Sequence, residues 1–332
     1  MEKKAIALIS GGLDSLLAAR VVMDQGVEVQ GVCFILQFAS RDTDSFIRKV
    51  LCASEEAGIQ VKFVDISEKF FNVLKDPGHG YGSNMNPCID CKILMLKVAK
   101  DMMKELGASF VVTGEVLGER PMSQHRRALD RIEKCSGLEG LLLRPLSAGF
   151  MEQTLPEEKG VLDRKKLWKI HGRGREKQLK LAKEYGLTRY FSPGGGCLLT
   201  DPMFSRKLRE LAKKGPLDKD NALLLKYGRH FRLDDGTKVV VGRNKDDNES
   251  LKGMKKKSDV VLWFGAKTPG PYAILRGKAT EGNIEKAAGL VVSHSRYRKE
   301  RTANVELLSG VGSPRQISTV ALSREEIEDL RV

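Results

Sequence analysis

Ser10-Gly11-Gly12-Leu13-Asp14-Ser15, directly after the apolar run 5–9, decides the fold of the first part of the chain. The apolar run has the length of a buried strand, and the apolar residues 16–19 open a helix. The two glycines let the backbone turn tightly and approach a ligand. Open N–H groups at the helix start and the two serine hydroxyls predict an anion site, where Asp14 fits beside phosphates if Mg²⁺ bridges them. An ordinary capped strand–turn–helix is the alternative reading.

Alternating strands and helices follow this loop. We expect strands at 27–35, 61–66, 110–114 and 141–146, and helices at 45–58 and 89–106, the latter ending at Gly107. Such βαβ units predict a parallel sheet with right-handed crossovers. Ligands bind outside the carboxyl ends of such strands. The loop 10–15, the strand end near Phe34 and the segment Thr113-Gly114-Glu115 should therefore converge.

Three cysteines have a context that indicates chemistry. Cys88 and Cys91 stand three residues apart at a helix start, where the helix dipole should favour thiolate and lower the pKa of both thiols. Cys197 follows three glycines. Structural zinc lacks a convincing fourth ligand, and a redox disulfide leaves the nucleotide loop without a purpose. Sulfur handling fits best, through a persulfide or through a [4Fe–4S] cluster with one open iron. Cys33 and Cys52 read as core residues.

Composition indicates a globular protein of two domains. The 332 residues are 41% hydrophobic and 30% charged, and no apolar run is long enough to span a bilayer. Six sparsely spaced cysteines and the lack of a leader segment predict a reducing cytoplasm and no membrane partner. Residues 1–150 hold 19 Lys and Arg against 19 Asp and Glu, so the whole net charge of +14 falls in residues 151–332. That bias favours a polyanionic partner.

The second part of the chain changes pattern. Residues 163–187 read as a basic helical stretch, 192–197 as a loop, and 201–214 as a short helix. Hairpin-like strands follow, with a turn at Asp234-Asp235-Gly236. We expect a nucleotide-binding domain at 1–204, a linker at 205–225 and a second, smaller basic α+β domain at 226–332.

The loop 10–15 resembles the SGGxDS pyrophosphate loop of the ATP pyrophosphatases, which cleave ATP between the α and β phosphates. This resemblance implies a Rossmann-like sheet of the HUP (adenine nucleotide alpha hydrolase-like) type. Together with Asn86-Pro-Cys-Ile-Asp-Cys91, it looks like the tRNA thiouridylases, the 2-thiouridine (MnmA) and 4-thiouridine (ThiI) synthetases. The segments 113–124 and Leu143-Arg-Pro-Leu146 resemble the 4-thiouridine group more closely. No rhodanese-like sulfur-carrying domain is recognisable, so sulfur should come from an external donor (sulfide or a cysteine desulfurase), which favours the [4Fe–4S] cluster over the persulfide.

The C-terminal part carries a second resemblance. Gly242-Arg-Asn244, Asp259-Val-Val-Leu-Trp-Phe264 and Pro269-Gly270 are similar to the NFACT-R (DUF814) domain, which is associated with RNA. Basic side chains there can contact phosphates, and Trp263 and Tyr297 could stack on bases, although core packing is favoured for Trp263. The expected RNA contacts are Arg243, Lys255, Lys256, Lys257, Arg296 and Arg298.

These features predict a tRNA thiouridine synthetase, most simply one that makes 4-thiouridine with ATP and Mg²⁺ through an adenylated base. The alternatives are an ATP pyrophosphatase that acts on a small molecule, and a non-enzymatic factor that binds tRNA or ribosomes. The expected catalytic residues are Asp14, Cys88, Cys91 and Cys197, the three cysteines being the candidate cluster ligands. The expected nucleotide-binding residues are Ser10, Gly11, Gly12, Asp14, Ser15, Phe34, Thr113, Gly114 and Gln124.

Overall fold

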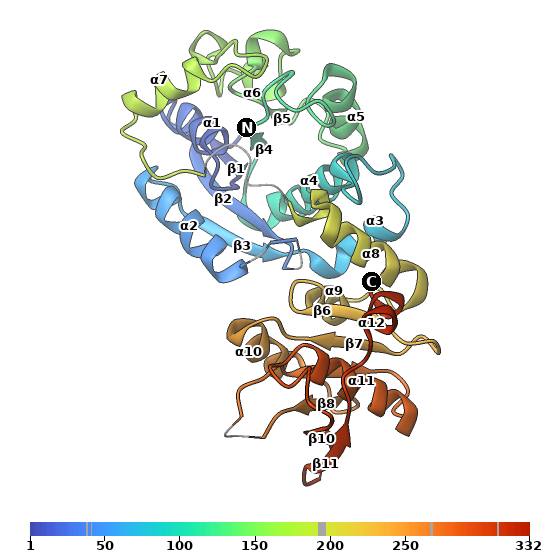
Figure 1. Cartoon of the computed structure of the whole chain (residues 1–332). Helices are drawn as coiled ribbons and strands as arrows, with labels where there is room; N and C mark the ends of the chain where they lie inside the picture. Colours follow the sequence, from blue (N-terminus) through green and yellow to red (C-terminus); the bar gives the residue numbers. More distant parts are fainter. Residues whose placement is uncertain (38, 41, 192–196, 266–267, 311) are drawn as a thin grey trace. The chain divides into compact units, whose positions relative to one another are not determined.

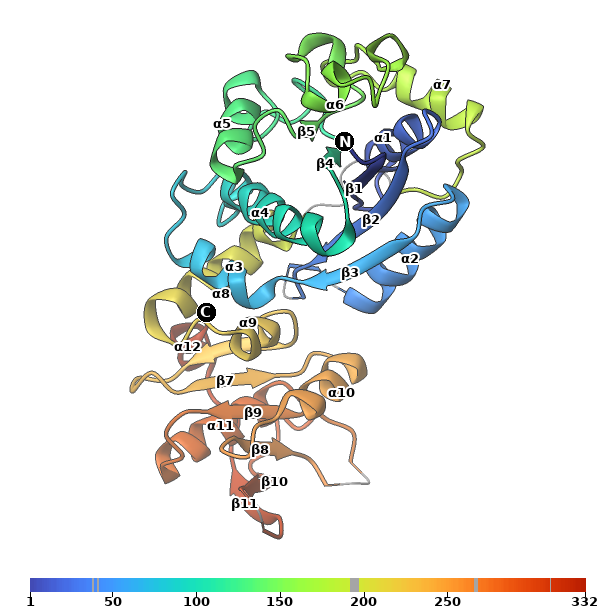
Figure 2. The same ribbon diagram turned by 180° about the vertical axis from the view of Figure 1, so that it is seen from behind.

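The structure is a computed structural model that describes every residue except 38, 41, 192–196, 266–267 and 311. It divides the chain into two compact units, Met1–Asp201 (unit 1) and Pro202–Val332 (unit 2), each seen from two sides in Figures 1 and 2. Among the described residues, no helix combines the length and the apolar character needed to cross a membrane.

Unit 1 is built on a parallel sheet of five strands in the order β3-β2-β1-β4-β5. The predicted parallel α/β sheet is therefore confirmed, with register pairs such as Leu8↔Val32 and Leu8↔Thr113. Its strands are β1 (Lys4–Leu8), β2 (Glu28–Ile35), β3 (Val61–Asp65), β4 (Phe110–Thr113) and β5 (Leu142–Leu143). Its α-helices are α1 (Leu13–Met23), α2 (Thr43–Glu56), α3 (Ser67–Lys75), α4 (Cys88–Leu106), α5 (Arg126–Ser136), α6 (Leu155–Glu158) and α7 (Glu176–Glu184).

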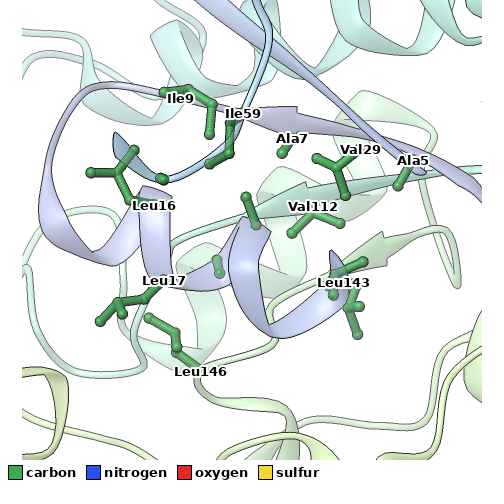
Figure 3. Close-up of a cluster of buried hydrophobic side chains, with 14 of the residues drawn as sticks. Ala5, Ala7, Ile9, Leu16, Leu17, Val29, Ile59, Val112, Leu143 and Leu146 are labelled. Atoms are coloured by element: carbon green, nitrogen blue, oxygen red, sulfur yellow. The ribbon is translucent and has the colours of Figure 1, made fainter. Parts of the chain in front are cut away.

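Helices cover both faces of this sheet (Figure 1). Residues of α1, α2 and α7 pack against one face, around Ala5, Ala7 and Val112. Figure 3 shows part of that cluster, with Leu16 and Leu17 of α1 beside the strands. Residues of α4 and α5 pack against the other face, around Ile6 and Leu8. Because apolar side chains are buried on both faces, the strands read as continuous apolar runs.

The predicted basic helix over residues 163–187 is wrong for its first half. Only α7 and a short 3-10 turn at Arg164–Lys166 are helical there. The backbone around Trp168 instead pairs with the segment after β5, since Trp168 N donates to Pro145 O at 2.8 Å and Ile170 N to Leu146 O at 2.8 Å. These hydrogen bonds to a distant segment replace the local ones that a helix would make.

Unit 2 has an antiparallel sheet of six strands in the order β11-β10-β8-β9-β7-β6. The predicted hairpin is present as β6 and β7, and the second, smaller α+β domain is confirmed. Residues 205–225, expected as a linker, lie in and between two helices of this unit, α8 and α9. The strands are β6 (Arg229–Arg232), β7 (Lys238–Val241), β8 (Val260–Trp263), β9 (Ala273–Arg276), β10 (Ala303–Ser309) and β11 (Arg315–Thr319). The helices are α8 (Pro202–Lys214), α9 (Lys219–Leu224), α10 (Lys245–Met254), α11 (Glu281–Ser293) and α12 (Arg324–Leu330).

The sheet of unit 2 also has a core on each face. The helices α11 and α12 contribute to a large cluster with Phe231, Val241 and Leu262. Leu224 of α9 and Leu251 of α10 pack on the other face. Unit 2 therefore has a buried core made entirely of its own residues.

Candidate functional site

The loop between β1 and α1 has the shape that its sequence predicts. Gly11 adopts a φ of +75°, a conformation that glycine reaches without strain. The hydroxyl of Ser15 donates to Gly12 O at 2.7 Å and accepts from Ser10 N at 3.2 Å. Ser10 Oγ accepts from Gly12 N at 3.4 Å. The two serines thus hold the loop closed around the helix start.

Two distant segments pack on this loop. A Cβ atom on Gly114, at the end of β4, would lie 2.5 Å from the backbone of Asp14, so only glycine fits there. Phe191 N donates to Gly11 O at 2.9 Å, and the Phe191 ring stacks on Phe46. The carboxyl end of β4 therefore meets the loop, as expected for a parallel sheet. Phe191, which lies outside the named strands, packs on the loop as well.

Asp14 is held in a buried, incompletely satisfied environment. Its Oδ2 accepts from Arg175 Nη2 at 3.1 Å, whereas its Oδ1 is buried without a hydrogen-bond partner. The Nε of Arg175 and the side-chain amide of the fully buried Gln178 are also unpartnered. Burial raises the pKa of Asp14, and the charge of Arg175 opposes that rise. Buried polar atoms without partners are rare in folded proteins, so this cluster has the character of a site awaiting a polar ligand.

Glu119 and Arg120 complete the charged surroundings of Asp14. Burial raises the pKa of Glu119, and the charge of Asp14 raises it further, so the two carboxyl groups lie near each other. One or two carboxylates together with phosphate oxygens are the usual ligands of Mg²⁺. The residues around the loop therefore fit a Mg²⁺ ion bound jointly with a triphosphate.

The structure brings the three predicted cysteines of unit 1 together. The segment before Cys88 is tied to the segment after Cys197: Asn84 Nδ2 donates to Thr200 O at 2.8 Å and Met85 N to Leu199 O at 3.2 Å. Thr200 N in turn donates to Cys197 O at 2.9 Å. The thiols lie close enough for the charge of Cys88 to act on both Cys91 and Cys197.

The predicted low pKa of the paired thiols is wrong. Burial raises the pKa of Cys91 to about 12 and that of Cys197 to about 11. Burial also raises the pKa of Cys88, but Arg120 and Lys92 oppose the rise there. Removal from water thus outweighs the helix dipole. Cys88 is left with the most favourable surroundings for a thiolate.

The other cysteines divide between core and surface. Cys33 is buried in β2, as predicted, and burial raises its pKa to about 12. Cys52 is exposed, so its assignment to the core is wrong. It lies on the solvent side of α2, where Val50 and Ala53 face inward instead.

A buried ionic network explains the Arg-Pro-Leu motif. Arg144 Nε lies 3.2 Å from Glu115 Oε2, and its Nη1 lies 2.6 Å from Glu133 Oε2. Lys92 Nζ, next to Cys91 in α4, lies 3.8 Å from Glu115 Oε1. Burial opposes ionisation of Glu115, but the charges of Lys92 and Arg144 hold its pKa below the usual range. The network links β4, α4 and α5 behind the loop.

Of the remaining predicted nucleotide-binding residues, Thr113 and Phe34 lie at strand ends of unit 1, and Gln124 lies just before α5. Thr113 is buried, and its hydroxyl donates to Glu115 Oε2 at 3.1 Å. Gln124 is also buried, and its Oε1 accepts from Arg120 N at 3.0 Å, which fixes the backbone of that arginine. Phe34, at the end of β2, is partly buried against the cluster of Ile6 and Leu8.

Sequence reasoning missed the cations that surround the loop and the thiols. The charge of Arg120 acts on Asp14, Glu119 and Cys88, and Arg175 pairs with Asp14 across 161 positions. The Gly118-Glu119-Arg120 turn was within a motif that the sequence singled out. Nothing local marked Arg175, because its role depends on tertiary contact.

The predicted RNA contacts of unit 2 are spread over several surface features. Arg243 pairs with Asp247 at 2.6 Å, and Lys256 with Asp220 at 2.7 Å. Arg296 stacks over the Tyr297 ring at 4.9 Å. Lys255, Lys257 and Arg298 are exposed, while Trp263 packs beside Tyr272. Tyr297 packs on Phe264 at 5.1 Å, so its ring belongs partly to the core.

The thiols supply the donor chemistry of an iron–sulfur cluster, since thiolates are its usual ligands. Over the described parts of the chain, no three His, Cys, Asp or Glu side chains form a group that could hold a metal ion. In a [4Fe–4S] cluster each cysteine binds a different iron, so three thiols need not meet at a single ion, and the cluster stays a prediction.

Both units match known families. Residues 1–152 match the family described as "Thiamine biosynthesis protein (ThiI)", and residues 228–331 match the "NFACT protein RNA binding domain". A tRNA-specific 2-thiouridylase MnmA of Campylobacter concisus is 33% identical over 115 residues, covering 33% of this chain and 34% of that protein. The MnmA of Helicobacter pylori strain G27 is 31% identical over 159 residues, covering 47% of this chain and 44% of its own. The chain thus spans less than half the length of these relatives.

Among solved structures, a 4-thiouridine synthetase–RNA complex with bound ATP is similar over 55% of this chain and 51% of its own, with 22% identity and a TM-score of 0.36. The fold of unit 1 and its Ser-Gly-Gly-x-Asp-Ser loop define a PP-loop nucleotide-binding domain. Residues 1–152 are thus similar to the ThiI family, and residues 228–331 to the NFACT RNA-binding domain.

Proposed function

We propose that this protein thiolates tRNA with ATP, converting a uridine to 4-thiouridine through an adenylated base. One observation carries the proposal: the charge of Arg120 acts on Asp14 of the nucleotide loop and on Cys88 of the cysteine group alike. The nucleotide loop and the gathered thiols therefore lie within electrostatic range of the same guanidinium. Activation of a carbonyl and delivery of sulfur need such proximity.

The first step is adenylation. The uridine O4 attacks the α-phosphorus of ATP, the bond to pyrophosphate breaks, and the N3 proton is lost. The loop N–H groups and Arg175 would stabilise the departing pyrophosphate. Asp14 with Glu119 would hold Mg²⁺, which when bound neutralises phosphate charge. Proximity and preformed dipoles supply most of the catalysis.

The second step delivers sulfur. We assign the persulfide to Cys88, because Arg120 and Lys92 oppose the rise of its pKa. A desulfurase persulfide passes its outer sulfur to the Cys88 thiol. The Cys88 persulfide then attacks C4, and AMP leaves. The Cys91 or Cys197 thiol attacks Cys88 Sγ, forming a disulfide and releasing 4-thiouridine; an external dithiol then reduces the disulfide.

The decisive experiment is mass spectrometry of tRNA nucleosides from cells with and without the gene, repeated in vitro with ATP and a persulfide donor. We expect 4-thiouridine to depend on the gene. ATP–pyrophosphate exchange without RNA would instead indicate a small-molecule substrate. Tight tRNA binding with unchanged nucleosides would indicate a non-enzymatic factor.

The cysteine assignment has its own test. Cys88→Ser should abolish thiolation, whereas Cys52→Ser, at an exposed thiol of the same unit, should leave it within about twofold. Mass spectrometry should find a persulfide, an added mass of about 32 Da for one sulfur atom, on Cys88 of the Cys91→Ser/Cys197→Ser protein, which lacks both resolving thiols. If anaerobically purified, active protein instead contains stoichiometric iron, a [4Fe–4S] cluster replaces the persulfide route.

A further inference from the structure

Unit 2 contains a cavity that the RNA-binding family match does not assign. Its volume is about 520 Å³, and it opens between the start of α10, the loop 269–271 and the end of α11. Among the side chains that line it are Arg243, Lys245, Lys252 and Arg296. Its volume lies within the range of about 300–1,000 Å³ that is typical of sites for small ligands.

The walls of this cavity are fixed by a single side chain. Asn248 Nδ2 donates to Gly270 O at 3.1 Å, and Asn248 Oδ1 accepts from Tyr272 N at 3.0 Å. A Cβ atom on Gly242 would lie 2.0 Å from Asn248 Oδ1, so only glycine fits at that position. The helix and the loop are therefore held apart at a set spacing. A preformed cavity avoids much of the entropy cost of binding.

The cavity has more cations than anions. Two of its cations are paired: Arg243 with Asp247 at 2.6 Å and Lys252 with Glu249 at 2.8 Å. Within the described ranges, neither Lys245 nor Arg296 has a carboxylate partner. Such an excess of positive charge in a fixed cavity favours an anion.

Arg229 adds to this excess from just behind the lining. Its Nη1 donates to Gly242 O at 3.4 Å. Its pKa is lowered by burial first and then by the nearby charges of Arg243 and Arg331. Like charges crowded in this way lose repulsion when a phosphate binds.

His294 gives the cavity a hydrogen-bond acceptor. Its Nδ1 lies 2.9 Å from Leu290 O, which requires the proton on Nδ1 and leaves Nε2 as an acceptor. Burial lowers the pKa of His294, the hydrogen bond to Leu290 O opposes that shift, and the charges of Arg229 and Arg331 lower the pKa further, which favours the neutral ring. Phosphate offers nothing to an acceptor, whereas a ribose hydroxyl does. The 2′-hydroxyl is the group by which proteins distinguish RNA from DNA.

We propose that this cavity binds one nucleotide of an RNA strand, its phosphate against Lys245 and Arg296 and its 2′-hydroxyl against His294. The inference rests on the proposed binding of tRNA by this protein. It adds Lys252 and His294 to the residues that the sequence had indicated. The Lys255–Lys257 run is not part of the cavity lining.

The charge of the cavity is tested on the full chain with fluorescein-labelled tRNA, without ATP or sulfur donor, over a series of salt concentrations. Lys245→Ala should weaken binding about five- to tenfold and reduce the slope of log K against log salt by about 0.7–0.9, as expected for one lost phosphate contact. Arg296→Gln should act in the same way. Lys278→Ala removes the same charge from an exposed position outside the cavity and should change affinity less than twofold. Equal losses of tRNA affinity in Lys245→Ala and Lys278→Ala would overturn the proposed cavity site.

The proposed contact between His294 and the 2′-hydroxyl is tested by comparing the binding of a single-stranded RNA with that of a DNA of the same sequence. The unaltered chain should prefer the RNA, and His294→Phe, which keeps a ring beside Phe231, should lose that preference without a change in salt slope. A preference that survives in His294→Phe would contradict the assigned hydroxyl contact. Displacement of tRNA by micromolar UMP would overturn an RNA strand as the occupant and indicate a free nucleotide. Because these assays involve no thiolation, absent 4-thiouridine would refute the proposed function and leave the cavity result standing.

Discussion

At the scale of single residues, Asp14 shows how the fold prepares a charge for a ligand. Burial raises its pKa, Arg175 is its one direct ionic partner among the described residues, and its second oxygen has no hydrogen bond. A carboxylate in this state is costly to bury, and a bound cation with phosphate oxygens would satisfy it. We therefore expect Asp14 to serve binding at the expense of stability.

Asp14→Asn should remove this function without harm to the fold. We expect the rate of AMP formation to fall at least 100-fold, about 2.7 kcal/mol of lost transition-state stabilisation, because the neutral amide binds Mg²⁺ much more weakly than a carboxylate. Affinity for tRNA should be unchanged, since the basic residues of unit 2 remain. The readouts are AMP release and tRNA anisotropy, with the exposed Asp44→Asn as the matched control. Normal AMP formation in Asp14→Asn would refute the assignment.

Lys238 in β7 is also a buried titratable group, but unlike Asp14 it belongs to neither the nucleotide loop nor the proposed RNA cavity. It is 3% exposed and its Nζ has no hydrogen-bond partner. Burial lowers its pKa from 10.5 to about 7, and Arg232, opposite it in β6, lowers it as well. Between these two pKa values the unfolded chain binds a proton that the folded chain does not. The stability of unit 2 should therefore rise from pH 7 to pH 10. Below pH 7 the lysine is charged in the folded chain as well, and the full cost of burying that charge lowers the stability.

Lys238→Met should remove that penalty. At about 1.4 kcal/mol per unit of pKa shift, we expect a gain of about 3–5 kcal/mol at pH 6 that vanishes near pH 10. Urea unfolding followed by Trp263 fluorescence, in a Trp168→Phe background, isolates unit 2 because the chain has two tryptophans. Lys278→Met, at an exposed position, is the control. A loss of stability at pH 6 would show that the amine is satisfied in solution.

At this scale the sequence could predict the residues that form local patterns. The loop 10–15 and the Cys88/Cys91 pair are recognisable because their spacing alone defines a shape. Arg175 and Arg120 were not predicted, since their partners lie far away in the chain. The pKa of the thiols was predicted in the wrong direction, because the sequence shows the helix start but not the depth of burial.

At the scale of elements, the network around Arg144 joins strands to helices behind the loop. Arg144 is 2% exposed, and it donates to Glu115 in the β4–α5 connection, Glu133 in α5 and Leu129 O. Such a pair adds little over apolar residues, but removal of one partner leaves a buried charge without compensation. The network therefore fixes how β4, β5 and α5 pack.

Arg144→Met should destabilise unit 1 by about 3–5 kcal/mol at pH 7, because Glu115 is left buried with the Thr113 hydroxyl and the more distant Lys92 as its described partners. The folded-state pKa of Glu115 is now low, so its stabilising effect is present above the unfolded value of about 4.3 and fades as pH falls below it. In the variant, Glu115 takes up a proton more readily, and the deficit should shrink between pH 7 and pH 4. Trp168 fluorescence in a Trp263→Phe background provides the measurement. The double variant Arg144→Met/Glu115→Leu should recover part of the lost stability. An equal loss in the single and the double variant would rule out the unpaired Glu115 as the cause.

Elements with strong periodicity were predictable, and those shaped by distant contacts were not. The sheet strands and α4, with its glycine end at Gly107, follow from runs of apolar residues and a recognisable stop. The segment 163–175 has a helical composition but forms hydrogen bonds with the residues after β5. Tertiary pairing overrides helix propensity there.

At the scale of the whole molecule, charge and chemistry are divided between the two units. Residues 202–332 hold 27 Lys and Arg against 17 Asp and Glu, which accounts for +10 of the net +14. The nucleotide loop and the gathered cysteines belong to unit 1, and the proposed RNA cavity belongs to unit 2. The uneven charge was visible in the sequence, whereas the concentration of cations around one cavity required the fold.

Residues 202–332 should fold without unit 1, because this unit has its own sheet with a buried core on each face. We expect the isolated fragment to unfold cooperatively in urea with a free energy of about 5–15 kcal/mol. It should bind tRNA with the same salt slope as the full chain, because the phosphate contacts lie within it. Circular dichroism, Trp263 fluorescence and tRNA anisotropy provide the readouts, and the Lys245→Ala fragment is the control for the cavity. A disordered fragment would mean that the core of unit 2 is insufficient alone, and a folded fragment with a much smaller salt slope would place phosphate contacts in unit 1 as well.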